Sequence, residues 1–410
     1  MRRVELIEYG EAEECPGLSE AQWATLRDCR LVKVEQKGKA LRRVKASTSR
    51  IGATVVGSGA GAVELRIRPK LPIKRILFMA GYAYSRLRWQ DHELHVEEHE
   101  ELLPALADVF ARMAERTLAR NVLMGYRTVE QALPVVRGQI RTSDQVNRHF
   151  GMALPVEVSY SDPTIDTPEN RILLTAAERL LALPDVDTTT RRLLHRVVGR
   201  LPGVARLHPG AAAPRWIATR LNAGYWSVLG LAEVVLRGNS FETADGQIHS
   251  VDGLLMIMHD VFEDFVTKAL ADALRPYGGS CHPQDTRTYL DHARTVQLIP
   301  DLVYDAPGPN GTEYPRAVVD AKYKVGRDSG GNPTDLYQAL AYCTALDLRS
   351  GHLVYASGAG VRAKEHRFNG KEGVVIHQHE LELDRPPAAV LAQIDVIAKM
   401  IVAQPHSQMS

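Results

Sequence analysis

The chain has 410 residues, a length that at about 150 residues per domain predicts two or three domains. Its 45% apolar and 24% charged residues are those of an ordinary globular protein, which excludes the disordered, collagen-like and low-complexity classes. The formal net charge of +1 excludes a uniformly basic nucleic-acid-binding surface.

The charge is divided unequally along the chain. Residues 251–410 contain 15 Lys and Arg against 20 Asp and Glu, whereas residues 1–250 contain 35 against 29. No stretch reaches the ~18 uncharged apolar residues of a membrane span, and no apolar run follows Met1 as in a signal peptide. The four cysteines form no C-x-x-C pair, so we expect free thiols and a cytoplasmic protein that contacts no membrane.

Residues 1–95 are expected to form a small β-rich domain. Short apolar runs alternate there with charge at Val4–Glu8, Leu31–Val34, Ala53–Gly57 and Val63–Arg68. This period of two is typical of half-buried strands joined by turns. The segment Gly57–Gly61 lacks the Gly-Lys-Ser/Thr of a phosphate loop, so we expect a flexible turn.

A basic stretch lies within this region and contains Lys33, Lys37, Lys39, Arg42, Arg43, Lys45 and Arg50. It is either a solvated hairpin face or a surface that contacts phosphate or an acidic partner, and the sequence leaves both interpretations open. Farther along, His92, His95 and His99 are interleaved with acidic residues. Because H-E-x-x-H is absent, a solvated strand or loop is favoured there over a metal site.

Residues 96–250 are expected to be mainly helical. Apolar residues recur every three or four positions from Leu102 and predict a helix to about Arg120. Thr167-Pro168-Glu169 is a helix start signal, because Thr caps, Pro suits the first turn and Glu suits the positive end of the dipole. Two further helices are predicted, from a cap at Asp187 through Arg200 and from Trp216 to Leu236.

Three polar residues of this middle region call for a role. Asp162 and Asp166 are expected to shape turns and cap the helix at 168 rather than to act in catalysis. Arg137 is open to three interpretations of equal weight: it positions a phosphate, supports a partner contact or pairs with an internal carboxylate.

Residues 251–410 have an order typical of an α/β sandwich. We predict helices over Gly253–Leu274, Asp335–Leu346 and Pro387–Ala403, with strands near 286–290, 296–304, 316–323, 352–356 and 373–379. Pro307–Gly311 is dense in turn residues and is expected to close a hairpin between the second and third strands. The chain as a whole is therefore predicted to be a multidomain α+β protein.

Two acidic residues are expected at the same end of neighbouring strands. Asp301 follows Ile299-Pro300, and Asp320 precedes Ala321-Lys322. Side chains repeat every two residues along a strand, so Lys322 shares a face with Asp320. Two carboxylates and the Ala321 carbonyl suit Mg²⁺, which could activate water and stabilise charge on a phosphate, while Lys322 holds or deprotonates that water.

This pattern resembles the PD-(D/E)XK nuclease superfamily, and two further features resemble its RecB-like branch. Glu263, on the helix before the strands, matches the acid that helps to hold metal in that branch. Gln338 and Tyr342 match its Q-x-x-x-Y motif, which packs over the site and touches DNA. The resemblance implies catalytic roles for Asp301, Asp320, Lys322, Glu263 and Gln338.

A narrower resemblance, to the McrC family of modification-dependent McrBC restriction systems, covers most of the chain. It rests on Leu65–Pro72, Arg137–Ile140, Tyr160–Leu173 and Met258–Glu263, which follow one another in the family's order. It implies a DNA endonuclease subunit whose activity depends on Mg²⁺ and is also supported by Mn²⁺. This subunit would bind and stimulate a hexameric AAA+ GTPase through its amino-terminal domain. Pairing of two nuclease domains would cut both strands.

From the basic stretch and the division of charge, we expect the partner-binding residues to be Lys33, Lys37, Lys39, Arg42 and Arg43. Two alternatives remain: a non-cutting activator of the motor that keeps the nuclease fold, and a free-standing RecB-like repair nuclease. The intact Asp301, Asp320 and Lys322 argue against the first, and the long non-nuclease half argues against the second.

Overall fold

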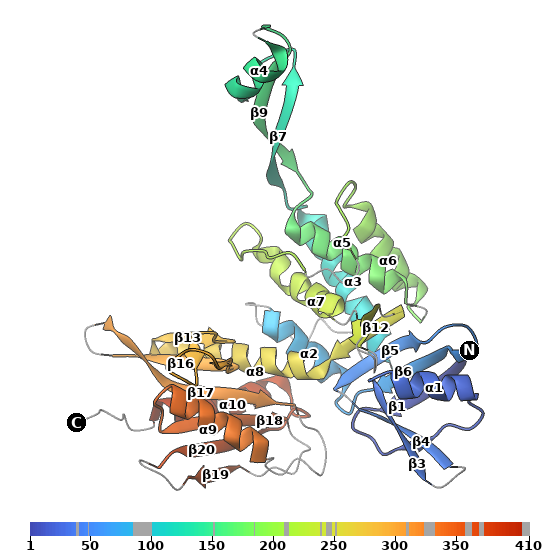
Figure 1. Ribbon diagram of the computed structural model, residues 1–410, viewed down its shortest axis with the longest axis vertical. Helices are drawn as coiled ribbons and strands as arrows, with labels where there is room; N and C mark the ends of the chain where they lie inside the picture. The colour runs from blue at the N-terminus through green and yellow to red at the C-terminus, as the bar shows by residue number, and fades with distance from the viewer. Residues whose placement is uncertain are drawn as a thin grey trace. The chain divides into compact units, whose positions relative to one another are not determined.

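A computed structural model of the chain describes residues 1–37, 41–47, 49–84, 101–150, 152–183, 185–208, 213–237, 240–242, 248–250, 252–308, 311–323, 333–356, 363–368 and 373–403. The chain forms two compact units, the first of Met1–Val109 with Arg237–Ser410 and the second of Phe110–Leu236. The chain therefore leaves the first unit, forms the second and returns to the first (Figure 1). Among the described residues, no helix combines the length and apolar composition that crossing a bilayer requires.

The predicted amino-terminal strands form a sheet in the first unit. This amino-terminal sheet has the order β1 (Arg2–Ile7), β6 (Val63–Arg68), β5 (Arg50–Val56) and β12 (Asp252–Ile257). β1 and β6 are parallel, and the other pairs are antiparallel. Val4 and Leu6 of β1 are buried at alternate positions, as the sequence period of two predicts.

The prediction of a helix from Gly253 is wrong, because residues 252–257 form β12 and the helix begins at Met258. A short apolar run has no period that separates strand from helix, and the open edge of β5 supplies hydrogen bonds for it. Gly253 has a φ of 148°, and a Cβ there would lie 2.2 Å from the Ala53 carbonyl oxygen. Glycine is therefore required where these two strands meet.

A second, smaller sheet carries most of the predicted basic stretch, whereas Arg50 lies on β5. Its order is β2 (Glu13–Glu14), β4 (Leu41–Ala46) and β3 (Val32–Lys37), and α1 (Glu20–Asp28) lies beside it. α1 begins with a capping box in which Ser19 and Gln22 exchange hydrogen bonds of 3.0 and 3.2 Å. Gly57–Gly61 is a turn, as predicted, that includes a short 3₁₀ segment.

Two helices follow the amino-terminal sheet in the first unit. α2 (Ile73–Tyr84) and α8 (Met258–Leu274) pack through Phe78, Tyr82 and Phe265, whose ring centroids lie 5.5 to 5.8 Å apart. α8 leads from β12 toward the carboxy-terminal part of the unit (Figure 1). One face of α8 is buried along its length, which fixes the direction in which its polar residues point.

The carboxy-terminal residues form a six-stranded mixed sheet, the carboxy-terminal sheet. Its order is β13 (Ser280–Pro283), β16 (Leu302–Pro307), β17 (Glu313–Lys322), β18 (Ser350–Ala356), β20 (Val375–Leu381) and β19 (Lys364–Arg367). β17, β18 and β20 are parallel, and the remaining pairs are antiparallel. α9 (Pro333–Ala345) and α10 (Pro387–Ala403) accompany the sheet, and the short strands β14 (Thr288–Tyr289) and β15 (Gln297–Leu298) pair separately.

Most of these carboxy-terminal elements agree with the sequence predictions, α10 at both ends. The strand predicted at 296–304 is divided into β15 and β16 by Ile299-Pro300-Asp301. Proline lacks the N–H of a ladder bond, which explains the interruption. β19 was not predicted from the sequence, because Lys364–Arg367 is polar throughout.

The longer helices of the second unit are α3 (Leu102–Arg120, which enters it from the first unit), α5 (Pro168–Leu181), α6 (Thr188–Gly199) and α7 (Trp226–Arg237). The Asp187 cap is confirmed by hydrogen bonds of 2.8 and 3.0 Å from Thr189 and Thr190. The predicted start of the last helix at Trp216 is wrong. α7 begins at Trp226, after a 3₁₀ segment at Ala223–Tyr225.

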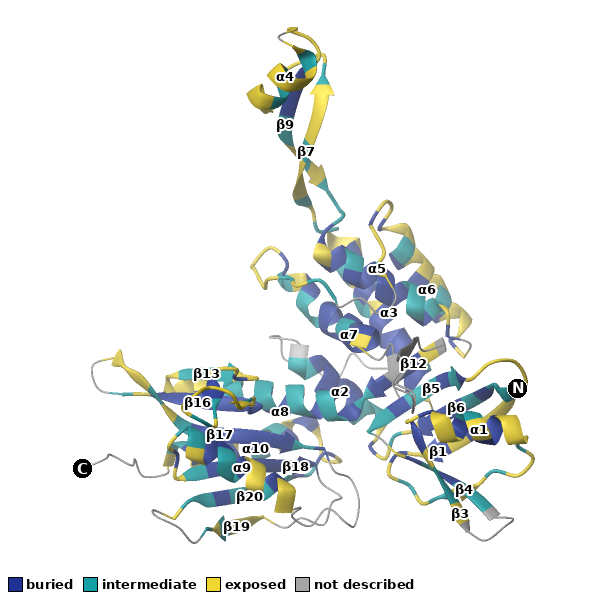
Figure 2. Cartoon of the chain, in the orientation of Figure 1, coloured by how far each residue is buried: buried dark blue, intermediate teal, exposed yellow. Residues whose placement is uncertain are grey.

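The prediction that the middle region is mainly helical fails at a three-stranded arm. The arm consists of β7 (Gly125–Leu133), β8 (Gln139–Ile140), α4 (Thr142–His149) and β9 (Val156–Thr164). β7 and β9 pair antiparallel over their whole length. Most of β7 is exposed (Figure 2). Because the residues of β7 are exposed or half-buried, its sequence lacks the strict alternation of apolar and polar residues by which a strand is recognised.

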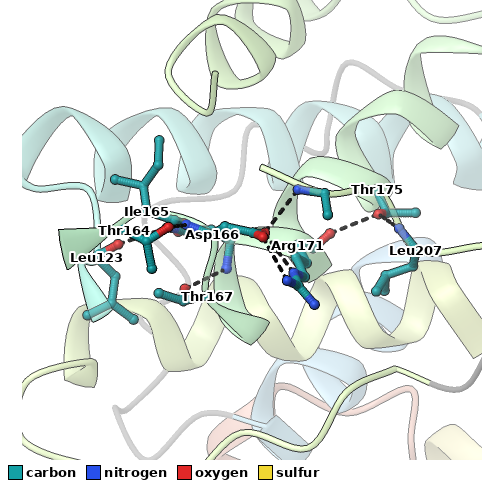
Figure 3. Close-up of polar contacts among 10 residues, drawn as sticks. Leu123, Thr164, Ile165, Asp166, Thr167, Arg171, Thr175 and Leu207 are labelled. Atoms are coloured by element: carbon teal, nitrogen blue, oxygen red, sulfur yellow. Dashed lines mark hydrogen bonds and ion pairs between the residues drawn. The ribbon is translucent and has the colours of Figure 1, made fainter. Parts of the chain in front are cut away.

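The junction between β9 and α5 is held by side-chain contacts (Figure 3). Thr167 caps α5 by accepting a 3.3 Å bond from the Asn170 N–H. Asp166 accepts two 2.7 Å bonds from the Arg171 guanidinium and one of 3.0 Å from the Ala205 N–H. The Arg171 hydrogen bonds lower the pKa of Asp166 to about 2. Asp166 therefore fastens the loop after α6 to the start of α5, while Thr167 is the cap.

Candidate active site

The two predicted acids lie opposite each other at the meeting of β16 and β17. Leu302 pairs with Val319, so the preceding Asp301 comes next to Asp320 at the end of this ladder. The Ala321 N–H donates a 2.7 Å bond to Asp301 Oδ2. At this position, just before β16 begins, the Asp301 side chain takes the place of a backbone acceptor for the Ala321 N–H. The structure thus brings Asp301, Asp320 and Ala321 together.

Lys322 contacts Asp320 through an ion pair between its ammonium and Oδ2. Asp320 is 2% exposed. Burial and the nearby Asp301 charge raise its pKa to about 6, although Lys322 opposes this. Burial alone would lower the pKa of Lys322, but Asp320 outweighs it and raises that pKa above its ordinary value. Lys322 is therefore a charged donor at neutral pH.

Glu263 reaches the same pocket from α8. Its Oε2 lies 3.3 Å from His259 Nε2, one helical turn earlier. Burial raises the pKa of Glu263. Burial, and then the charge of Glu263, raise the pKa of Asp301 to about 7. Three carboxyl groups thus lie near one another in poorly solvated surroundings, where ionising all of them is unfavourable without a cation.

Gln284 bridges two of these acids, a role that the sequence gave no reason to assign. Its side-chain amide donates to Glu263 Oε1 and, at 3.5 Å, to Asp301 Oδ1. Its N–H donates a 3.0 Å bond to the Asp301 carbonyl, and its φ of 47° is in the left-handed region. Gln284 lies just after β13 in a segment without hydrophobic period, so no sequence signal marks it.

The Q-x-x-x-Y residues lie on α9 beside the site. Gln338 is exposed, and its amide donates a 2.7 Å bond to the Tyr342 hydroxyl. That hydroxyl donates to the Ile299 carbonyl at 3.3 Å, two residues before Asp301. Tyr342 is only 3% exposed and its ring belongs to the core beneath α9. Gln338 is therefore the member of this pair that offers an exposed polar group.

A further buried acid, Asp335, lies at the start of α9. It is 5% exposed and accepts a 3.0 Å bond from the Tyr355 hydroxyl. Tyr355 pairs with Lys322 across β17 and β18, and the Asp335 charge contributes to the raised pKa values of Asp320 and Lys322. In the sequence, Asp335 is an acidic residue in the first turn of a predicted helix, where an acid is favourable for the helix itself. Nothing in the sequence therefore indicated that it lies near the site.

Glu263, Asp301 and Asp320 do not form the tightest set of ligand-type atoms. Among the described residues, the group whose ligand atoms all lie within 4.8 Å of one another is His282, Asp305 and Glu313, elsewhere on the carboxy-terminal sheet. There, His282 Nε2 and Asp305 Oδ2 are 2.9 Å apart, and Arg287 lies 3.5 Å from the same oxygen. This group is an ion-pair network, and it was not predicted as a site.

The basic stretch is partly neutralised within its own sheet. Arg42 pairs with Glu20 at 2.8 Å and stacks over Trp23, and Arg43 pairs with Glu14 at 2.9 Å. Lys33 is exposed. The side chain of Lys37 and all of Lys39 lie outside the described residues, as do His92, His95 and His99.

Arg137 lies on the arm and pairs with a carboxylate, one of its three predicted roles. Its guanidinium is 3.1 Å from Asp162 Oδ1 and lies over the Tyr160 ring at 3.9 Å. The arm also exposes a set of large apolar side chains that the sequence analysis missed: Tyr126, Val135, Val136, Ile140, Val146, Phe150, Met152 and Leu154. Such a concentration of exposed apolar residues is typical of an interaction surface.

Comparison with known proteins gives a family match and structural neighbours. The model of a family described as McrBC 5-methylcytosine restriction system component matches residues 48–356, more than half of the chain. A chain in a refined half-complex from a tetradecameric assembly of Thermococcus gammatolerans McrB AAA+ hexamers with bound McrC is 18% identical, with a TM-score of 0.56 over 97% of this chain and 100% of that one. A chain in the cryo-EM structure of the Thermococcus gammatolerans McrBC complex is 20% identical, with a TM-score of 0.42 over 68% of this chain and 89% of that one. No curated protein matches the sequence.

Proposed function

The chain belongs to the McrBC 5-methylcytosine restriction system component family, and from this membership we propose that it is the Mg²⁺-dependent DNA endonuclease subunit of such a system. The observation that carries the proposal is the meeting of Asp301, Asp320 and Lys322 at the end of β16 and β17, with Ala321 bonded to Asp301. This arrangement supports our interpretation of these residues as a PD-(D/E)XK site. The reaction is hydrolysis of a DNA phosphodiester, in which water attacks phosphorus and one P–O bond breaks.

The oxygen-rich donor set fits a hard divalent cation. Asp301, Asp320 and Glu263 would supply carboxylate oxygens to Mg²⁺. Ala321 would supply its carbonyl, because a ladder residue directs its N–H and C=O to the same side and the N–H already faces Asp301. When bound, Mg²⁺ acidifies water and stabilises negative charge on the phosphate, and Mn²⁺ should also support activity because it favours the same oxygen donors.

The remaining residues orient the reactants. Lys322, charged and held by Asp320, donates a hydrogen bond to the attacking water and fixes its direction toward phosphorus. Gln338 contacts the DNA from α9, and Tyr342 holds the Gln338 amide in place from beneath. Gln284, which bridges Glu263 and Asp301, must turn away for a cation to contact both carboxylates.

The partner that we propose is a hexameric AAA+ GTPase of the McrB type, the kind of protein with which the similar McrC chain is assembled. Lys33, Lys37, Lys39, Arg42 and Arg43 form one candidate contact. The arm forms a second, because its exposed apolar side chains have no cover in its own unit. Pairing of two nuclease domains would allow both DNA strands to be cut.

The decisive experiment compares the wild-type chain with the Asp320→Asn variant, with the partner, GTP, Mg²⁺ and methylated duplex DNA. The matched control is Asp305→Asn, which neutralises another buried carboxylate of the same sheet away from the site. We expect cleavage by the wild type and the control but not by Asp320→Asn. Cleavage by Asp320→Asn at the control's rate would refute the site. GTPase stimulation by a wild type that never cuts would favour a non-cutting activator instead.

A further inference from the structure

A buried hydrogen bond joins the end of β1 to Tyr323, the residue that directly follows β17. Glu8, the residue after β1, is 0% exposed, and its N–H donates a 2.8 Å bond to the Arg68 carbonyl. Its Oε2 accepts a 3.0 Å bond from the Tyr323 hydroxyl. These two residues are separated by most of the chain, yet both lie in the first unit. A buried carboxyl group is costly, so its retention there calls for an explanation.

Tyr323 is placed to affect two residues of the candidate site. It directly follows Lys322 in the chain, and it is 2% exposed. Its ring lies 5.9 Å from that of Phe262, the residue before Glu263 on α8. Tyr323 is therefore the chain neighbour of Lys322, and its ring packs beside the chain neighbour of Glu263.

The amino-terminal side of this contact is equally well fixed. Glu8 continues from β1, which is hydrogen-bonded to β6 along its whole length. Tyr9 lies at a φ of 49°, and its hydroxyl approaches the Tyr323 carbonyl at 3.5 Å, with the two rings 6.4 Å apart. The two residues after β1 thus contact Tyr323 by hydrogen bonds and by ring packing.

We propose that the Tyr323–Glu8 hydrogen bond is a positioning contact that holds Lys322 and Glu263 in their cutting geometry and makes the cutting rate depend on the amino-terminal sheet. The inference rests on the proposed nuclease function and adds two positioning residues to it. The physical reason is that a catalytic group must be held within a fraction of an ångström, and Lys322 lies at the very end of its strand. The carboxyl group of Glu8 anchors the residue after that end, where the ladder has stopped.

The test uses the full-length chain with its partner, GTP, Mg²⁺ and duplex DNA. Tyr323→Phe removes only the hydroxyl, Glu8→Ala removes the acceptor, and Glu8→Gln keeps an acceptor oxygen. Tyr304→Phe is the matched control, because it removes a buried tyrosine hydroxyl bond, 2.9 Å to the Gly278 carbonyl, from the neighbouring strand β16. Thermal unfolding by circular dichroism establishes which variants fold.

We expect Tyr323→Phe and Glu8→Ala each to lower kcat for cleavage by about tenfold, with KM for DNA and GTPase stimulation changed less than about twofold. Glu8→Gln should retain most of the wild-type kcat, as should Tyr304→Phe. The double variant Glu8→Ala with Tyr323→Phe should be no slower than either single variant, because both remove one bond.

Folded Tyr323→Phe and Glu8→Ala variants that cut as fast as Tyr304→Phe, with a double variant that is also unimpaired, would overturn the positioning role. A double variant whose loss equals the product of the single losses would overturn it too. A wild-type chain that cuts no DNA under these conditions refutes the proposed function itself. A wild type that cuts beside an unimpaired Tyr323→Phe refutes only the positioning contact.

Discussion

The Ala321 N–H donates a 2.7 Å hydrogen bond to Oδ2 of Asp301, so a backbone group of β17 orients a carboxylate that precedes β16. The bond fixes one oxygen of Asp301 and leaves the other facing Gln284. It also makes the geometry of Asp301 depend on the ladder rather than on a side-chain rotamer alone. Variants at this position can therefore separate folding from chemistry.

The first prediction concerns Asp301→Asn. Its amide oxygen can still accept the Ala321 N–H, so the fold should survive, while the loss of negative charge should lower the cleavage rate by at least about a hundredfold. Asp305→Asn is the control for a neutralised carboxylate in the same sheet. The measurement is single-turnover cleavage alongside thermal unfolding. A folded Asp301→Asn variant that cuts within a few-fold of the control contradicts the assignment.

The second prediction concerns Mg²⁺ affinity and pH. The pKa values of Asp301 and Asp320 are raised to about 7 and about 6, chiefly by burial, so both bind protons that Mg²⁺ must displace. Mg²⁺ affinity should therefore rise steeply between pH 5.5 and about 7.5 and level off above that range. Isothermal titration calorimetry in buffers of different ionisation enthalpy measures both the affinity and the protons released. Binding without proton release near pH 6 contradicts the prediction.

The third prediction concerns stability and Glu8. Burial raises the pKa of Glu8 from an ordinary 4.5 to about 7, although Tyr323 and Lys70 oppose this. Above pH 4.5 the folded state therefore holds a proton that the unfolded state has released, so Glu8 makes stability fall as pH rises toward 7. Glu8→Gln should remove this fall, so that its free energy of unfolding decreases less from pH 5 to pH 7 than that of the wild type.

The control for this variant is Glu64→Gln on the adjacent strand. Burial would raise the pKa of Glu64, but Arg66 and Arg3 outweigh it and lower that pKa. Glu64 thus contributes stability above its ordinary pKa that is lost as pH falls, the opposite sign. Denaturant unfolding at pH 5 and 7 measures the Glu8 effect, whereas the Glu64 effect lies mainly below its ordinary pKa of 4.5, so Glu64→Gln should keep nearly the wild-type difference between pH 5 and 7. Equal pH dependence in wild type and Glu8→Gln contradicts the prediction.

The sequence predicted which residues meet at the candidate site better than it predicted the contacts that support them. Asp301, Asp320 and Lys322 were found because strand period and motif spacing are local properties. Gln284 and the Tyr323–Glu8 bond escaped because each depends on residues far apart in sequence that only the fold brings together. The arm escaped for a different reason: its strands are exposed on most positions, so they lack the apolar period by which strands are recognised.

The fourth prediction tests the arm as a partner contact. Phe150 is 88% exposed at the end of α4, with a φ of 46° that aspartate tolerates. Phe150→Asp should lower stimulation of the GTPase by at least about fivefold, since it places a charge where apolar contact is expected. Leu221→Asp is the control, because Leu221 is 90% exposed in the same unit but outside the arm. Equal stimulation by the two variants contradicts docking through the arm.

The fifth prediction follows from the division of charge. Residues 251–410 carry more acidic than basic residues, 20 against 15, and their site holds Glu263, Asp301 and Asp320. Non-specific DNA affinity comes mostly from phosphate neutralisation by Lys and Arg, so this region draws DNA in poorly by itself. We expect the isolated chain to cut duplex DNA slowly with Mg²⁺ at ~150 mM salt, and at least about tenfold faster with the partner and GTP.

The basic stretch gives this last prediction a second readout. Replacing Lys33, Lys37, Lys39, Arg42 and Arg43 by Ala should weaken the acceleration by the partner more than it changes partner-free cleavage. Arg42 and Arg43 also pair with Glu20 and Glu14, so Glu20→Gln with Glu14→Gln is the control for the loss of these ion pairs alone. Surface pairs contribute little to stability, so both variants should fold. Equal cleavage with and without partner would mean a self-sufficient enzyme and would favour the free-standing repair nuclease.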